Sequence, residues 1–195
     1  MQTSGQSPPD DAAAGARATD FDGLFEHTSP TLFAWASLRV GATLRGRVDA
    51  EDIVQEVWVR ARANFTSFDA SATAFRPWLL GIARNVVLQA IEHHEREVRA
   101  PAGADGSRFS FSRIPDEATA VSRRVARDEG LRKLLAWIEA LPSDERMLVV
   151  LCGLEGKTCA SAGQRLGVSD EAATKRWQRL RARLADQRAP ADWLA

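Results

Sequence analysis

The stretch from Asp49 to Arg62 is the part of the sequence that most constrains the fold. Its apolar residues recur every three or four positions, which places them on one stripe of a helix; they are Ile53, Val54, Val57, Trp58 and Ala61. Asp49 precedes the run and Asp52 follows three positions later, in the spacing of a capping pair. The first two turns are acidic on their polar side, which suits the positive end of the helix dipole. From its period alone, the stretch predicts an amphipathic helix with a solvated face.

The remaining apolar residues also follow helical spacing, and no strand pattern stands out. A short helix is predicted near residues 21–25. Ser29 and Pro30 fit the cap and first position of a second helix that continues to about residue 44. Pro77 is tolerated only in a first turn, so the long apolar pattern around it predicts a helix that starts at residues 73–76.

The second half of the sequence predicts four more helices. The first spans residues 118–140, with Gly130 as a weak point, because glycine costs about 1 kcal/mol in a helix interior. The next three are separated by capping or breaking residues, which are Ser143 or Asp144, Gly156, Thr158, Gly167 and Ser169. A short helix, a tight turn at Gly167 and a longer basic helix over residues 170–187 have the layout of a helix-turn-helix.

These elements predict an all-α fold made of two small helical domains joined by a flexible linker. The linker is indicated by proline, glycine and serine without a period between residues 100 and 115. The expected order is a disordered leader at 1–18, a helical bundle at 19–98, the linker at 99–117, a helix-turn-helix domain at 118–188 and a tail at 189–195.

Composition argues against several classes of function. The formal net charge is zero, which does not favour unaided DNA binding, although residues 174–188 carry six basic residues against one acid. Without a signal peptide or a membrane-length apolar run, we expect a cytoplasmic protein with no membrane insertion. No phosphate loop, activated nucleophile or ligand cluster is evident, so we expect no enzyme, cofactor or metal. Cys152 and Cys159 lack the further ligands of a zinc site and are expected to be small buried thiols.

The last predicted helix carries a polar face suited to DNA. In a helix-turn-helix, early residues of the second helix meet base edges and later arginines meet phosphates. The residues that project away from the apolar stripe are Glu171, Ala172, Thr174, Lys175, Gln178 and Arg179. A plain helical hairpin with a solvated basic face is the alternative interpretation.

Three stretches resemble bacterial RNA polymerase sigma factors of the extracytoplasmic-function (ECF) group. DAEDIVQEV, which begins at Asp49, resembles the helix that grips the polymerase clamp. FRPWLLGIARNVV, which begins at Phe75, resembles the minus-ten helix. Residues 140–184 resemble, in order and spacing, the segment that binds the minus-35 element. The resemblance covers roughly residues 20–98 and 118–187.

The resemblance implies a sigma factor that binds core RNA polymerase, directs it to specific promoters and assists melting of the minus-ten element. By family likeness, the residues facing the polymerase clamp are Asp52, Gln55, Glu56 and Arg60. Those expected at minus-ten DNA are Phe65, Phe68, Asn85, Gln89 and His93. Those expected at minus-35 DNA are Glu171, Thr174, Lys175, Arg176 and Arg179. The family often has an anti-sigma protein that occludes these surfaces, and the sequence leaves open whether one exists here.

Two departures from the family pattern keep other functions open. Gly163 stands where the family usually has alanine, which indicates a looser helix-turn-helix. The minus-ten helix ends in the acidic EHHERE rather than in an arginine run. One alternative is a stand-alone helix-turn-helix regulator, and the other is a helical adaptor of polymerase without promoter recognition.

Overall fold

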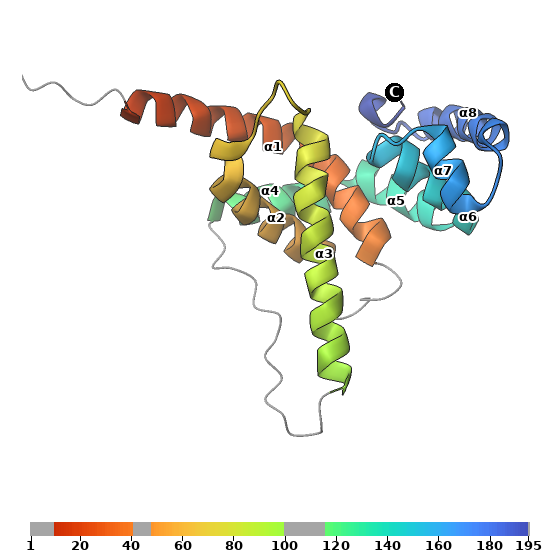
Figure 1. The fold of residues 1–195 in the computed structure, drawn as a ribbon, viewed down its shortest axis with the longest axis horizontal. Helices are drawn as coiled ribbons and strands as arrows, with labels where there is room; N and C mark the ends of the chain where they lie inside the picture. The colour runs from red at the N-terminus through yellow and green to blue at the C-terminus, as the bar shows by residue number, and fades with distance from the viewer. Residues whose placement is uncertain (1–9, 41–47, 100–115, 195) are drawn as a thin grey trace, which may run out of the picture.

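The computed structural model describes residues 10–40, 48–99 and 116–194, and all secondary structure in these ranges is helical (Figure 1). The predicted all-α class is confirmed for this part of the chain. We call residues 10–40 and 48–99 the N-terminal half and residues 116–194 the C-terminal half. None of the described helices combines the length and apolar character that a membrane span needs.

α1 (Asp10–Val40) is one continuous helix, where the sequence predicted a disordered leader and two helices. Residues 10–18 form its first turns, whereas residues 1–9 and 41–44 lie outside the described ranges. Pro30 lies inside the helix rather than at its start. Ser29 is buried and its hydroxyl donates to the Phe25 carbonyl at 2.6 Å, so it is not the N-cap that the sequence predicted. Figure 1 shows α1 changing direction along its length, as expected for a helix in which proline removes a backbone hydrogen bond.

α2 (Ala50–Asn64) and α3 (Phe75–Arg99) begin where the sequence predicted. Asp49 is the N-cap of α2, and the short turn η1 (Phe65–Ser67) follows its last residue. α1, α2 and α3 pack against one another. The predicted apolar stripe of α2 faces this core, since Ile53, Val54, Val57, Trp58 and Ala61 are all buried.

α4 (Asp116–Arg127) and α5 (Glu129–Glu139) replace the single helix predicted over residues 118–140. The break is at Asp128, whose carboxylate accepts the Leu131 amide at 2.7 Å as the N-cap of α5. Gly130 therefore lies in the first turn of α5, not at the break. α4 packs on α1 and α2, although the sequence assigned these residues to the second domain. Most of the predicted linker, residues 100–115, lies outside the described ranges.

The rest of the C-terminal half comprises α6 (Ser143–Leu148), the π-helical segment η2 (Val149–Leu154), α7 (Cys159–Leu166), α8 (Asp170–Asp186) and the short turn η3 (Ala191–Trp193). The predicted caps of α7 and α8 are confirmed, since Thr158 accepts the Ser161 amide and Ser169 accepts the Ala172 amide, each at 3.2 Å. Pro142, rather than Ser143 or Asp144, is the N-cap of α6.

Two glycines end helical segments in the left-handed region, which only glycine enters without a steric penalty. Gly156 has φ of 63° after η2, and Gly167 has φ of 67° between α7 and α8. Both positions agree with the predicted breaks. The tight turn at Gly167 sets α7 against α8, and the two helices pack directly on each other.

Candidate functional site

The N-terminal end of α2 presents Asp52 in the capping box that the sequence predicted. The backbone amide of Asp49 donates to Oδ2 of Asp52 at 3.4 Å. Burial raises the pKa of the Asp52 carboxyl, the hydrogen bond from Asp49 lowers it, and the charge of Asp49 raises it further, with a net upward shift. Asp52 is half-buried, so its carboxyl group still reaches solvent at the start of the helix.

The next turn of α2 is covered by protein. Gln55 and Glu56 are 9% and 2% exposed. Gln55 Nε2 donates to the hydroxyl of Ser122 on α4 at 3.0 Å, and Ser122 is itself fully buried. Glu56 Oε1 accepts a hydrogen bond from Arg60 Nε at 2.6 Å. The structure therefore places two of the four predicted polymerase-binding residues inside the molecule, with α4 in contact with Gln55.

Arg60 connects the predicted polymerase set to the predicted minus-ten set. Besides its contact with Glu56, its guanidinium donates to Gln89 Oε1 on α3 at 2.7 Å. Asn85 and Gln89 are exposed and His93 is half-buried. Since these three positions are four residues apart, they share one face of α3. The structure thus brings together α2 and α3 residues that the sequence assigned to different partners.

Phe65 and Phe68 belong to an aromatic cluster at the junction of α2 and α3. Their rings stack with centroids 5.7 Å apart, and Phe68 lies 5.1 Å from the ring of Trp78. Phe75 packs edge-on against both phenylalanines. Both are half-buried, so each serves the core and keeps part of its ring accessible. Such a platform has the chemistry to stack with an unpaired base.

The helix-turn-helix of α7 and α8 presents the predicted minus-35 residues on the first turns of α8. Lys175 Nζ pairs with Glu171 Oε1 at 2.6 Å, and Thr174 donates to Asp170 Oδ1 at 3.3 Å. Arg176 lies 3.6 Å from Asp144 on α6, and Arg179 is exposed. The opposite stripe is buried as predicted, at Ala173, Trp177, Leu180 and Leu184. All five predicted minus-35 residues are therefore collected on one helix, away from the core.

Gly163 has a packing role that the sequence did not indicate. A β-carbon there would lie 3.0 Å from the Val168 carbonyl oxygen and 3.3 Å from Cβ of Ala173. The glycine lies where α7 meets the turn and α8, because these near contacts come from that turn and that helix. A side chain at position 163 would therefore crowd the turn and α8.

The sequence missed a buried charge between the two halves. Glu155 is 8% exposed and accepts a hydrogen bond from Trp35 Nε1 at 2.9 Å. Its carboxylate also pairs with Arg39 at 2.6 Å and with Arg84 at 2.9 Å. We call Trp35, Arg39, Arg84 and Glu155 the interdomain clasp. The sequence analysis gave no role to Glu155, and no local pattern connects residues so far apart in the sequence.

The predicted tail is also anchored. Trp193 is fully buried and its indole donates to the Thr31 hydroxyl at 2.8 Å. Arg76 donates to the carbonyl oxygens of Leu154 at 2.8 Å and Asp192 at 2.8 Å, and to that of Gly153. We call Thr31, Arg76, Asp192 and Trp193 the tail anchor. It fixes the end of the described chain to α1 and α3.

The two cysteines lie in the C-terminal half. Cys152 is buried and Cys159 is half-buried. Burial, followed by the charge and hydrogen bond of Cys159, raises the pKa of the Cys152 thiol to about 12. Cys152 is therefore a poor nucleophile at neutral pH. The described residues contain no cluster of three or more potential metal ligands.

Comparison with known proteins agrees with this geometry. The Sigma-70 region 2 family matches residues 24–97, which hold α2, η1 and most of α3. RNA polymerase sigma factor CarQ of Myxococcus xanthus is 30% identical over 163 residues, which are 82% of this chain and 83% of the relative. ECF RNA polymerase sigma factor EcfG of Rhodopseudomonas palustris is 31% identical over 156 residues, 79% of this chain and 80% of the relative. The chain belongs to the ECF family of RNA polymerase sigma factors.

Some relatives are much longer than this sigma factor. The probable RNA polymerase sigma factor RfaY of Xanthomonas campestris is 28% identical over 146 residues, which are 75% of this chain but 36% of that protein. The chain thus spans about a third of one curated relative and over four-fifths of another. No solved structure matches the chain.

Proposed function

We propose that this sigma factor binds core RNA polymerase in the cytoplasm, directs it to specific promoters and assists melting of the minus-ten element without catalysis of its own. The observation that carries the proposal is the order of three parts along the chain. A capped helix with an acidic start precedes an aromatic platform, and a capped helix-turn-helix follows. Each part suits one step, namely docking, strand capture and groove recognition.

We assign the partners residue by residue from the resemblance of these motifs to those of the family. Asp52, Gln55, Glu56 and Arg60 would contact polymerase, and Phe65, Phe68, Asn85, Gln89 and His93 would contact the minus-ten strand. Glu171, Thr174, Lys175, Arg176 and Arg179 would contact the minus-35 element. Residues 19–98 and 118–188 would form the two functional domains, with α4 bridging them in the present arrangement.

The test is transcription in vitro with purified core polymerase. Adding the protein should cause co-elution with core on a sizing column and start transcripts at defined positions on a promoter library. An adaptor without promoter recognition would co-elute but start no specific transcripts. A stand-alone regulator would bind promoter DNA tightly at physiological salt and would not co-elute. Either of these results would overturn the proposal.

A further inference from the structure

We propose that the C-terminal half holds this sigma factor in a closed form that hides the polymerase-binding face of α2, so that the protein must open before it binds core polymerase. The inference rests on the proposed function and adds a conformational step to it. It is drawn from contacts between the two halves, none of which the family resemblance or the relatives' names describe.

α4 is the element that covers α2. Gln55 donates to the buried Ser122 hydroxyl at 3.0 Å, so this predicted polymerase contact is already occupied from within the chain. Val125 is buried, and Arg124 pairs with Glu26 on α1. A partner that needs the Gln55 amide must therefore displace α4.

The position of α4 is linked to that of the C-terminal half. Only Asp128 separates α4 from α5, and its side chain is fixed as the cap of α5. Because one residue leaves little slack, a movement of α5 away from α1 pulls directly on the end of α4. Contacts that hold the elements from α5 through α8 against the N-terminal half therefore also keep α4 in place over α2.

The interdomain clasp supplies that attachment. Glu155 brings a carboxylate from the end of η2 to two arginines and an indole of α1 and α3. Its side chain is 2% exposed, whereas those of Arg39 and Arg84 are 27% and 45% exposed. When the halves separate, the three charged side chains become hydrated, which offsets part of the lost pairing energy. The clasp can therefore be broken and formed again.

The tail anchor adds a second attachment on the same side. Trp193 is buried against α1 through Thr31, and Arg76 of α3 donates to carbonyl oxygens of η2 and the tail. Arg76 and Arg84 both lie on the polar side of the predicted minus-ten helix. Closure therefore also engages cationic groups next to the predicted promoter-binding face.

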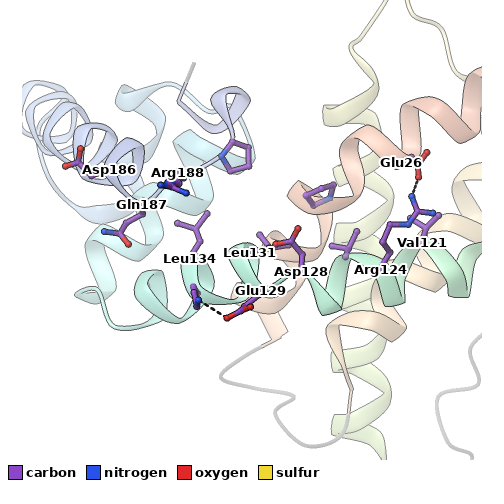
Figure 2. A pocket seen from close by; sticks show the side chains of 15 residues that line it. Glu26, Val121, Arg124, Asp128, Glu129, Leu131, Leu134, Asp186, Gln187 and Arg188 are labelled. Carbon is purple, nitrogen blue, oxygen red and sulfur yellow. Dashed lines mark hydrogen bonds and ion pairs between the residues drawn. The ribbon is translucent and has the colours of Figure 1, made fainter.

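The junction is incompletely packed elsewhere. Figure 2 shows a cleft between α5 and the end of α8 on one side and α1 and α4 on the other, with Leu134 and Arg188 at one end of it and Glu26 and Arg124 at the other. The cleft has a volume of about 750 Å³. The junction thus combines a clasp, an anchor and an open cleft, and opening it also exposes apolar residues such as Trp193, which belongs to a core cluster shared by both halves.

The consequence for binding follows from population arithmetic. If only the open form binds core polymerase, the apparent Kd equals the intrinsic Kd divided by the open fraction. A variant that weakens the clasp should therefore bind core polymerase more tightly, although it has lost contacts. A purely structural role for Glu155 predicts the opposite, that is, weaker or unchanged binding.

The experiment compares the full-length protein with Glu155→Lys, which sets a third cation against Arg39 and Arg84. Glu139→Lys is the matched control, since it makes the same charge change at an exposed position of the same half. Glu155→Gln keeps the shape and removes only the charge, in case Glu155→Lys does not fold. The measurements are circular dichroism, the radius of gyration by small-angle X-ray scattering, and the Kd for core polymerase.

We expect Glu155→Lys to stay helical, to increase the radius of gyration and to lower the Kd about fivefold or more, in the usual range of coupling between sites. Glu155→Gln should shift both quantities in the same direction but less, and Glu139→Lys should shift neither. Adding Arg39→Glu to Glu155→Lys should restore a compact protein with a Kd nearer that of the wild type.

Two results overturn the closed form. One is an unchanged radius of gyration in both Glu155 variants, and the other is an expanded protein whose Kd for core is unchanged or higher. In both cases wild-type binding to core still stands. If instead the wild type and all variants fail to bind core, the proposed function itself is wrong, whatever scattering shows about opening.

Discussion

The carboxylate of Glu155 accepts a hydrogen bond from the indole of Trp35 at 2.9 Å, across 120 positions of sequence. A buried carboxylate is costly unless it is paired, and here two arginines complete its surroundings. Removing one partner would leave an uncompensated charge, so the group acts as a unit. The contact between the halves therefore depends on ionisation, which makes it testable by pH.

The first prediction concerns acid. Burial alone would raise the pKa of Glu155, but hydrogen bonds from Trp35 and Arg39 and the charges of Arg39 and Arg84 hold it below its ordinary value of 4.5. A lowered pKa means that the folded protein favours the ionised form. Its contribution to stability is complete above about pH 4.5 and is lost as the pH falls through the folded-state pKa.

Glu155→Gln removes this titration and isolates it. At pH 7 the variant should be less stable by about 1–3 kcal/mol in urea unfolding, the usual effect of losing hydrogen bonds to a charged group. The difference between wild type and variant should shrink as the pH is lowered from 5 to 3. A difference that stays constant over that range would mean that the pKa of Glu155 is the same in the folded and unfolded protein, which would contradict the lowered pKa.

The second prediction concerns the close approach at Gly163. Valine there would drive its branched side chain into the Val168 carbonyl and Ala173, at which even a β-carbon would lie 3.0 and 3.3 Å away. We expect a loss of about 1–3 kcal/mol from overpacking. Gly81→Ala is the matched control, because nothing lies within 4 Å of its added β-carbon. It should stabilise α3 by about 0.5–1 kcal/mol through helix propensity. Thermal unfolding of both variants tests this, and equal effects would contradict the packing argument.

The third prediction concerns docking to polymerase. Asp52→Lys reverses the charge of one of the two predicted polymerase residues that remain half-exposed in the closed arrangement, the other being Arg60. We expect at least a tenfold weaker Kd for core polymerase, equivalent to about 1.4 kcal/mol or more. Glu51→Lys makes the same change one position earlier in the same helical turn and should bind nearly as wild type. If both reversals weaken binding equally, the effect is general electrostatics and Asp52 has no special contact.

Local chemistry made much of the fold predictable. The structure has several of the local signals that the sequence predicted, and each acts within a few residues. They are the caps Asp49, Thr158 and Ser169, the first-turn Pro77 and the left-handed Gly167. The spacing of apolar residues likewise identified the buried stripes of α2 and α8. These signals are readable because their partners are neighbours in the sequence.

What the sequence did not predict depends on contacts between distant residues. Ser29 and Pro30 have the local features of a helix start, but α1 passes through them because the buried residues on both sides pack as one helix. Gln55 stays a predicted polymerase contact, and its hydrogen bond to Ser122 on α4 is the part that the sequence did not indicate. Trp193 ends a segment read as a tail, yet it is fully buried. In each case the observed contact depends on tertiary packing, which no local sequence pattern reports.

The fourth prediction concerns groove recognition by α8. Arg179 is exposed on the helix that carries the predicted minus-35 residues, about three turns after Ser169 caps it. Arg179→Ala should weaken binding to a minus-35 duplex by about 1–3 kcal/mol if the guanidinium reads a base, or should reduce the salt dependence by about one unit if it meets a phosphate. The measurement is fluorescence anisotropy with promoter DNA at several salt concentrations.

Arg181→Ala is the control for this prediction. It removes the same charge from the same helix, but two residues further along a helix turns the side chain by about 200°, away from the direction of Arg179. A long-range electrostatic effect would treat the two arginines alike, whereas a docked recognition helix would not. If both variants lose the same affinity with the same salt slope, α8 contributes only net charge, and base-edge recognition through Arg179 is ruled out.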